Sequence, residues 1–379
     1  MAVGIIAEYN PFHNGHLYQI KKIKEMYQDE EIILVLSGNF TERGIPSIIN
    51  KWQKVDIAKH FGIDLIVELP FYYATQSADF FAEGAISILE NLKVDKLIFG
   101  SENDDIKTLE IIAKCQIDNP DFDKLVKIYL RTGLNYPTAI SNAVYDLTGE
   151  KIDTPNDLLG ISYIKTILKN NYKIEPITIK REDNYHSEDI KEISSATAIR
   201  KALKEKKEIK DAVPEYVYSI LKKEKLHYID DYFRLLKYRI ITEDNLEKYK
   251  DIDEGLDSLL KKSIIETNSY DELIKKVKTK RYTHNKISRA LLHILIGLKK
   301  VDNYSDKYIR ILDFNNKGRD YLNKVKKESK IEILSKFKRN NKMLELELKS
   351  TIIYDIPYNE DLGKYEYRNN IKGEENDKN

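Results

Sequence analysis

Near its start the chain reads Gly4-Ile-Ile-Ala-Glu-Tyr-Asn-Pro-Phe-His-Asn-Gly-His16. The apolar, β-branched run from Val3 to Ala7 predicts a buried strand, and Asn10-Pro11 ends it. The residues from Leu17 to Ile20, followed by two lysines, begin a helical pattern. His13 and His16 are therefore predicted to lie in the turn between a strand and a helix.

The two histidines of this turn allow two interpretations. His-x-x-His is a zinc-ligand spacing, but a zinc site needs further ligands, and the chain has 1 cysteine and 7 mostly scattered histidines. The second interpretation is a phosphate site, because N–H groups at a helix start attract anions and Gly15 lets a ligand approach the main chain. Imidazoles three residues apart can both face that anion. We therefore expect a nucleotide-phosphate site and no protein-bound metal.

Charge is unevenly distributed along the 379 residues, although the net charge is only +1. Residues 1–100 carry 9 basic and 13 acidic side chains, whereas residues 271–350 carry 22 and 10. This asymmetry favours a polyanion-binding second half, the alternative being solvated, lysine-rich helices. The chain has one cysteine and no basic leader, and no apolar stretch approaches the roughly 20 residues that span a bilayer. We therefore expect a cytoplasmic protein without a membrane segment.

The first hundred residues alternate between strand and helix patterns. Short apolar runs end at Ser37-Gly38, at Glu68 and at Gly100, and helical patterns lie between them, at about residues 47–61 and 78–92. Repeated strand–helix units predict a parallel sheet with right-handed crossovers. Ligands bind beyond the carboxyl ends of such strands, so this edge is expected to gather these residues beside His13 and His16.

A second anion-binding element is predicted after residue 171. Residues 172–181 have the pattern of a final strand, which ends at Arg181. Ser194 or Ser195 is a good N-cap for a helix that follows, and the free N–H groups at its start suit an anion. Arg200, one turn into that helix, is placed to reach a β- or γ-phosphate.

These two elements resemble the HxGH and ISSTxIR motifs of the adenylyltransferase superfamily, which has a Rossmann-like fold. A denser resemblance, over about residues 1–300, is to the bacterial tRNA(Met) cytidine acetate ligases. Its motifs are Glu8-Tyr-Asn-Pro-Phe-His-Asn-Gly-His16, Ser37-Gly-Asn-Phe-Thr-Glu-Arg-Gly44, Lys51-Trp52, Val67-Glu-Leu-Pro70, Gln76-Ser-Ala-Asp79, Phe81-Ala-Glu-Gly84, Phe99-Gly-Ser-Glu102, Pro155-Asn-Asp-Leu-Leu-Gly160 and Lys280-Arg-Tyr-Thr283.

The resemblance implies an activity and a set of ATP contacts. The family activates acetate with ATP as acetyl-adenylate and then acetylates the wobble cytidine of elongator tRNA(Met) to N4-acetylcytidine. The implied ATP-binding residues are Ile6, Ala7, Glu8, Tyr9, Asn10, Pro11, Phe12, His13, Asn14, Gly15, His16, Leu17, Tyr18, Gln19, Gly100, Asn156, Arg181, Ser195 and Thr197. We expect His13, His16 and Arg200 to be catalytic, stabilising charge on the phosphates, and Mg²⁺ to accompany ATP.

The basic half is the expected tRNA surface, because cations interleaved with aromatic side chains suit phosphate contacts and base stacking. The candidate residues are Lys278, Lys280, Arg281, Tyr282, Lys286 and Arg289. For the acetate pocket, the candidates are Ser37, Gly38, Asn39, Arg43, Gln76 and Ser77, with no choice possible among them.

The expected fold class is α/β, with a Rossmann-like parallel-sheet nucleotidyltransferase domain and a C-terminal α-helical domain. The expected boundaries are residues 1–200 for the ATP-binding domain, 201–350 for the basic helical domain and 351–379 for a polar, acidic tail. Two rival functions remain at this stage. One is a small-molecule adenylyltransferase of the same superfamily, and the other is a tRNA-binding protein without catalysis.

Overall fold

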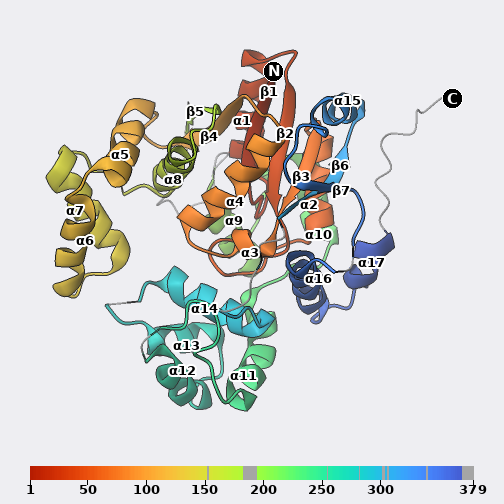
Figure 1. The fold of residues 1–379 in the computed structure, drawn as a ribbon. Helices are drawn as coiled ribbons and strands as arrows, with labels where there is room; N and C mark the ends of the chain where they lie inside the picture. The colour runs from red at the N-terminus through yellow and green to blue at the C-terminus, as the bar shows by residue number, and fades with distance from the viewer. Residues whose placement is uncertain are drawn as a thin grey trace.

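The computed structural model describes residues 1–151, 153–181, 194–253, 255–280, 282–300, 304, 307–338 and 340–368. Seven strands form one sheet in the order β5-β4-β1-β2-β3-β6-β7 (Figure 1). They are β1 (Ala2–Ala7), β2 (Glu31–Ser37), β3 (Leu65–Leu69), β4 (Lys96–Ser101), β5 (Glu175–Lys180), β6 (Tyr308–Phe314) and β7 (Glu332–Leu334). The strands β1 to β5 pair in parallel, which confirms the predicted α/β sheet.

Helices cover both faces of this sheet. Within β2, Ile32, Leu34 and Leu36 pack on one face, whereas Ile33 and Val35 pack on the other. This burial on both sides explains the continuous apolar strand sequences. The first face is covered by α1 (Asn14–Met26), α2 (Lys51–His60), α9 (Ala196–Lys204) and α10 (Glu215–Lys223). The second is covered by α4 (Ala78–Asn91), α5 (Ile106–Asp118), α8 (Pro155–Lys169) and α15 (Asn316–Val325).

Two further groups of helices extend from the sheet (Figure 1). The helices α6 (Phe122–Arg131) and α7 (Tyr136–Thr148) pack against each other beyond α5. Below the sheet in Figure 1, a helical cluster has its own apolar core, which also includes Phe40 and Phe71. This cluster consists of α11 (Phe233–Thr242), α12 (Leu256–Ile265), α13 (Tyr270–Val277) and α14 (His284–Ile296). Three short helices lie elsewhere in the described chain: α3 (Phe71–Ala74), η1 (Lys210–Ala212) and η2 (Ile229–Tyr232).

The expectation that residues 201–350 are helical requires a correction. After the helical cluster the chain returns to the sheet, where β6 pairs antiparallel with β3 and β7 pairs with β6. The sequence Tyr-Ile-Arg-Ile-Leu-Asp-Phe of β6 has the β-branched and aromatic character of a strand, and the basic segments around it hid that signal.

The expected tail of residues 351–379 also needs a correction in its first part. Residues 351–355 continue α16 (Lys342–Asp355), and α17 (Leu362–Arg368) follows. Thr351 and Glu366 are buried, so this part of the chain packs into the protein. Residues 369–379 lie outside the described residues. None of the described helices has the length and apolar character needed to span a membrane.

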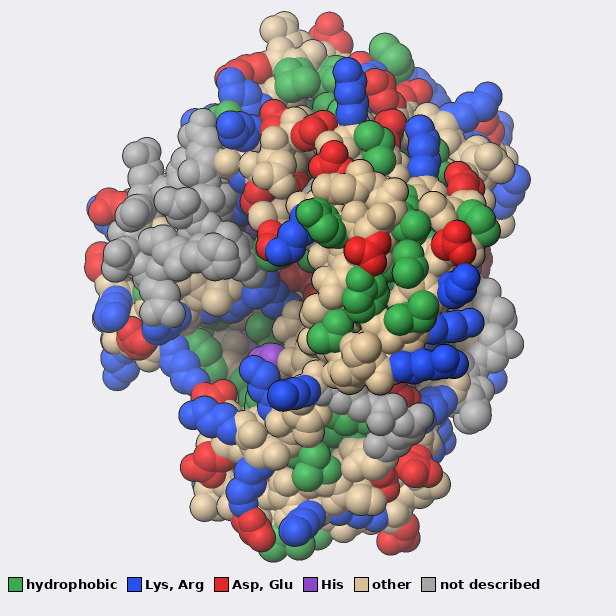
Figure 2. Space-filling model, turned by 90° about the vertical axis from the view of Figure 1, so that its left-hand side faces the viewer, with side chains coloured by type: hydrophobic (Ala, Val, Ile, Leu, Met, Phe, Trp, Pro, Cys, Tyr) green, Lys and Arg blue, Asp and Glu red, His purple; other side chains and the backbone are tan. Residues whose placement is uncertain are grey.

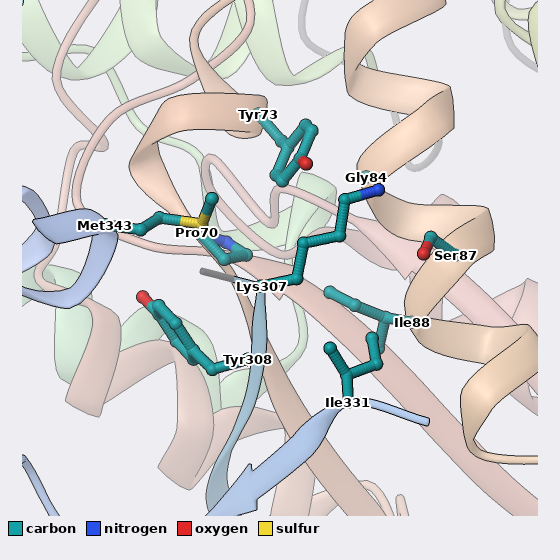
Figure 3. A pocket seen from close by; sticks show the side chains of 9 residues that line it. All are labelled: Pro70, Tyr73, Gly84, Ser87, Ile88, Lys307, Tyr308, Ile331 and Met343. Atoms are coloured by element: carbon teal, nitrogen blue, oxygen red, sulfur yellow. The ribbon is translucent and has the colours of Figure 1, made fainter. Parts of the chain in front are cut away.

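Close packing fills the junction between α3, α4 and β6 (Figure 3). A Cβ on Gly84 would lie 2.3 Å from the ring of Tyr73, so only glycine allows α4 to approach that ring. The cavity left here has a volume of 10 Å³, room for about one water molecule at most. This junction is therefore a packed core rather than a ligand site.

A buried cluster of charges ties the C-terminal helices to the sheet. The Lys51 ammonium lies 2.5 Å from Glu68 of β3, 3.3 Å from Glu347 of α16 and 2.7 Å from Glu366 of α17. The guanidinium of Arg310 in β6 also contacts Glu68 and Glu366, at 3.3 and 2.5 Å. Burial raises the pKa of Glu347 to about 8, so at pH 7 the cluster balances two cations with two carboxylates.

Replacing Lys51 with Met should destabilise the protein by about 3–5 kcal/mol, because the carboxylates around it would be left buried with Arg310 alone. The matched control is Lys59→Met on the same helix, where an ammonium that is 32% exposed pairs with Asp313 at 3.3 Å. That change should cost about 0–1 kcal/mol. Urea unfolding measures both, and equal costs would contradict the role given to Lys51.

Candidate nucleotide-binding site

The turn between β1 and α1 is held by two interlocked imidazoles. His13 is the N-cap of α1, and its Nδ1 accepts a hydrogen bond from the N–H of Gly15 at 3.1 Å. The Nδ1 of His16 accepts from the N–H of His13 at 3.2 Å, and the two ring centroids are 3.8 Å apart. A neutral imidazole whose Nδ1 accepts carries its proton on Nε2. Each ring therefore carries its proton on Nε2.

The His16 ring is neutral at physiological pH. Burial lowers its pKa well below the usual range, and His13 and Arg181 act in the same direction. Removing a charged group from water disfavours the charged form, which is the dominant effect here. His16 therefore acts as a neutral hydrogen-bond donor, already protonated at Nε2, and not as a titrating cation.

The main chain that leads into this turn is held in place from several sides. Tyr9 has a positive φ of 46°, the Asn10–Pro11 peptide is cis, and the Tyr9 ring is buried. The side chain of Asn10 accepts a hydrogen bond from the N–H of Ile48 at 2.7 Å. These contacts position the backbone immediately before His13, which confirms a strand–turn–helix at this point.

The structure brings the start of α9 to the same turn. Ser195 is the N-cap of α9, and its hydroxyl accepts from the N–H of Ala198 at 3.2 Å. Arg200 donates to the carbonyl of Asn10 at 2.6 Å. Arg200 and Arg43 each donate to the hydroxyl of Thr197 at 3.2 Å. Two guanidinium groups on one hydroxyl, next to the histidine turn, form a strongly electropositive site suited to phosphates.

The three other expected nucleotide contacts lie at the ends of β4 and β5 and at the start of α8. A Cβ on Gly100 would lie 3.1 Å from the Arg181 side chain, and the N–H of Arg181 donates to the Ser101 carbonyl at 2.9 Å. The side-chain amide of Asn156 donates to Glu102 at 2.5 Å. In addition, Gln19 of α1 donates to the carbonyl of Ile98 at 3.2 Å, which joins α1 to β4.

Lys54 holds the ends of β1 and β2 together, a role that sequence reasoning missed. Its buried ammonium donates to the carbonyls of Glu8, Ser37 and Gly38 at 2.9, 2.7 and 2.7 Å. Burial lowers the pKa of Lys54 to about 7, and Glu8 partly opposes that shift. In the sequence, the sign of this role was a lysine inside the helical pattern of residues 47–61. Its partners are carbonyls that only the fold brings together.

The candidates for the acetate pocket separate into two groups. Asn39 and Gln76 are buried and structural, since Asn39 accepts from the N–H of Lys51 at 2.8 Å and Gln76 donates to a main-chain carbonyl. Ser37 is fully buried, and its hydroxyl has no hydrogen-bond partner among the described residues. Ser37 and Arg43 are therefore the candidates that keep polar groups directed at this edge of the sheet.

The expected RNA-binding residues differ in their exposure and in their ion pairs. Lys278 and Lys280 are exposed. The Tyr282 ring is buried, and Lys286 pairs with Asp253 at 2.7 Å. Arg289 pairs with Glu42 at 2.8 Å. The backbone of α14 at Arg289 packs against Gly44, and a Cβ added to Gly44 would lie 2.4 Å from it. Arg281 lies outside the described residues.

Comparisons with known proteins bear on this geometry. The sequence model of the HIGH nucleotidyl transferase family matches residues 1–369. The chain belongs to this family. It is 40% identical to a tRNA(Met) cytidine acetate ligase of Caldicellulosiruptor saccharolyticus, over 95% of this chain and 94% of that protein. A tRNA(Met) cytidine acetate ligase of Clostridium perfringens is 39% identical, over 93% and 94%. The resemblance inferred from the motifs is thereby confirmed.

Two solved crystal structures share the fold. The crystal structure of Thermotoga maritima TmcAL bound with alpha-thio ATP has a TM-score of 0.86 and 32% identity, covering 94% of this chain and 95% of that one. The apo form of the same protein has a TM-score of 0.88 and 31% identity, with the same coverage. An ATP analogue bound by this fold agrees with ATP as the nucleotide of the family.

Metal ligation was the alternative for the two histidines. Within the part of the chain that the structure describes, no group of three or more His, Cys, Asp or Glu side chains is arranged to hold a metal ion. The Nδ1 atoms of His13 and His16 are already occupied by backbone N–H groups. That Mg²⁺ accompanies ATP and is bound mainly through its phosphates stays a prediction.

The depressed pKa of His16 gives a testable stability effect. Below pH 6.5 the unfolded chain binds a proton at His16 that the folded protein does not, so the folded state loses stability as the pH falls. In His16→Gln this contribution is absent. Between pH 7.5 and 5.5 the wild type should therefore lose more stability than the variant in urea unfolding, by on the order of 1 kcal/mol. Equal losses would show that His16 titrates normally in the fold.

Proposed function

We propose that this chain is an ATP-dependent acetate ligase that acetylates the wobble cytidine of elongator tRNA(Met) to N4-acetylcytidine. The observation that carries the proposal is the convergence of two Nε2–H donors, from His13 and His16, with Arg200 at one edge of a parallel sheet. The relatives named tRNA(Met) cytidine acetate ligase align with nearly the whole chain, which supports the choice of substrates.

In the first half-reaction, a carboxylate oxygen of acetate attacks the α-phosphorus of ATP, and pyrophosphate leaves. Negative charge then grows on the oxygens of the α-phosphate and of the leaving group. The imidazole donors of His13 and His16 and the positive end of the α1 dipole stabilise that charge without a proton transfer. Arg200, held beside the turn by the Asn10 carbonyl, neutralises the pyrophosphate. The product is acetyl-adenylate.

In the second half-reaction, the exocyclic amine of the cytidine attacks the acetyl carbonyl, and AMP leaves. The base must be unstacked from the anticodon loop to reach this site, as is usual for enzymes that modify a base. The exposed Lys278 and Lys280 supply RNA contacts near the start of α14. Arg289 and Tyr282 have structural roles in addition, since they anchor the elements that present these lysines.

Incubation with ATP, ¹⁴C-acetate and elongator tRNA(Met) tests the proposal. Label in the tRNA, released as N4-acetylcytidine by nuclease digestion, is the expected result. Transfer of AMP to a small molecule, with no label in RNA, would favour an adenylyltransferase of the same superfamily. Binding of tRNA with no consumption of ATP would favour a non-catalytic tRNA-binding protein.

Two variants should separate the chemistry from RNA binding. His16→Ala removes one phosphate donor and is expected to slow acetylation by about 100- to 1,000-fold while tRNA affinity stays unchanged. The double variant Lys280→Glu, Arg281→Glu should weaken tRNA binding and leave ATP affinity unchanged, because its charges contact RNA phosphates only. Filter binding and calorimetry measure the two affinities. Full activity of His16→Ala would refute the phosphate role of His16.

A further inference from the structure

A cavity of 460 Å³ lies between two parts of the chain that are far apart in sequence. One wall is the turn between α6 and α7, and the other is the connection from α13 to α14. Its size is within the range of small-molecule pockets, roughly 300–1,000 Å³. The residues that line it are Gly133, Leu134, Asn135, Lys278, Thr279, Lys280, Tyr282, Thr283 and His284.

The electrostatics of this cavity suit an anion. None of the nine lining residues is acidic, and Lys278 and Lys280 bring two exposed ammonium groups to it. Both α7 and α14, each 13 residues long, begin at its walls, so the positive ends of two helices add to the field. On the face that carries α5 to α7, Figure 2 shows lysine and arginine side chains gathered around a hollow.

An exposed aromatic side chain follows one wall of the cavity in sequence. Tyr136 follows Asn135 directly, and it is 58% exposed. Exposed tyrosines next to basic grooves stack on the bases of single-stranded nucleic acids, while the cations contact the phosphates. The start of α7 therefore offers an exposed aromatic ring next to the cavity wall at Asn135.

The cavity is connected to the nucleotide-binding site through Arg43. Partial burial and the Lys278 ammonium lower the pKa of His284, and the Arg43 guanidinium acts in the same direction. Arg43 also donates to Thr197 at the start of α9, which Arg200 contacts too. Arg43 is therefore close enough to act on His284 of the cavity while it contacts the start of α9.

We propose that this cavity binds a phosphate-bearing nucleotide of the RNA substrate, and that the α6–α7 turn forms part of the RNA-binding surface. The inference rests on the proposed function and adds to it a wall from residues 133–136, which the basic composition of the second half did not indicate.

Asn135→Asp is the test, because it adds one negative charge to the cavity and preserves the N-cap. The Asn135 oxygen accepts from the N–H and hydroxyl of Thr138 at 3.1 and 3.0 Å, and a carboxylate accepts equally well. The matched control is Asn119→Asp between α5 and α6, where the side-chain oxygen accepts from the N–H of Asp121 at 3.0 Å. The two sites are separated by the length of α6, about 15 Å.

Filter binding with elongator tRNA(Met) at 50 mM salt should show an affinity about fivefold weaker for Asn135→Asp and unchanged for Asn119→Asp. The difference should shrink at 500 mM salt, since the added charge is then screened. Thr279→Glu, on the opposite wall, should weaken binding similarly. If the cavity variants and the control bound tRNA with the same affinity, the proposal would be wrong. It would also be wrong if the cavity variants bound ATP more weakly and tRNA as tightly as the wild type does.

The acetylation assay keeps this result separate from the proposed function. If the wild type binds tRNA through the cavity but transfers no acetate, the proposed function fails and the binding site stands. If the wild type acetylates tRNA and Asn135→Asp leaves the KM for tRNA unchanged, the cavity proposal fails alone.

Discussion

The reciprocal hydrogen bonds between two imidazoles and the first turn of α1 are the constraint on which this structure depends. By accepting from the N–H groups of Gly15 and His13, the two rings satisfy backbone donors and at the same time fix their own tautomers. A free helix start would offer N–H groups alone. Here the N-terminal turn carries two oriented imidazole donors, so charge developing on a phosphate meets groups that need no reorganisation.

Much of this site could be predicted because its signals are local. The apolar run before Asn10-Pro11, the spacing of His13 and His16 and the N-cap at Ser195 each involve neighbours in sequence. That these elements meet follows from a general property of parallel sheets, whose strands end at a common edge. The contact of Arg200 with the Asn10 carbonyl is the point where the two predicted elements join.

What could not be predicted depends on partners distant in the chain. The charges of Lys51 and Lys54 are ordinary in sequence, and only the fold shows that one contacts three carboxylates and the other three carbonyls. Likewise, Arg289 belongs to a basic segment but pairs with Glu42, which lies 247 positions earlier. The strand β6 was missed because its pairing partner, β3, precedes the whole helical cluster.

The placement of Glu366 has a consequence for the order in which the protein matures on the ribosome. Lys51 and Glu68 are translated early, yet one of the carboxylates that neutralises Lys51 belongs to α17, almost at the end of the described chain. While α16 and α17 are still inside the exit tunnel, Lys51 lacks its partners Glu347 and Glu366. The buried charge cluster therefore remains incomplete until α17 has left the tunnel, and nonsense mutations that remove α17 would leave a buried, uncompensated cation.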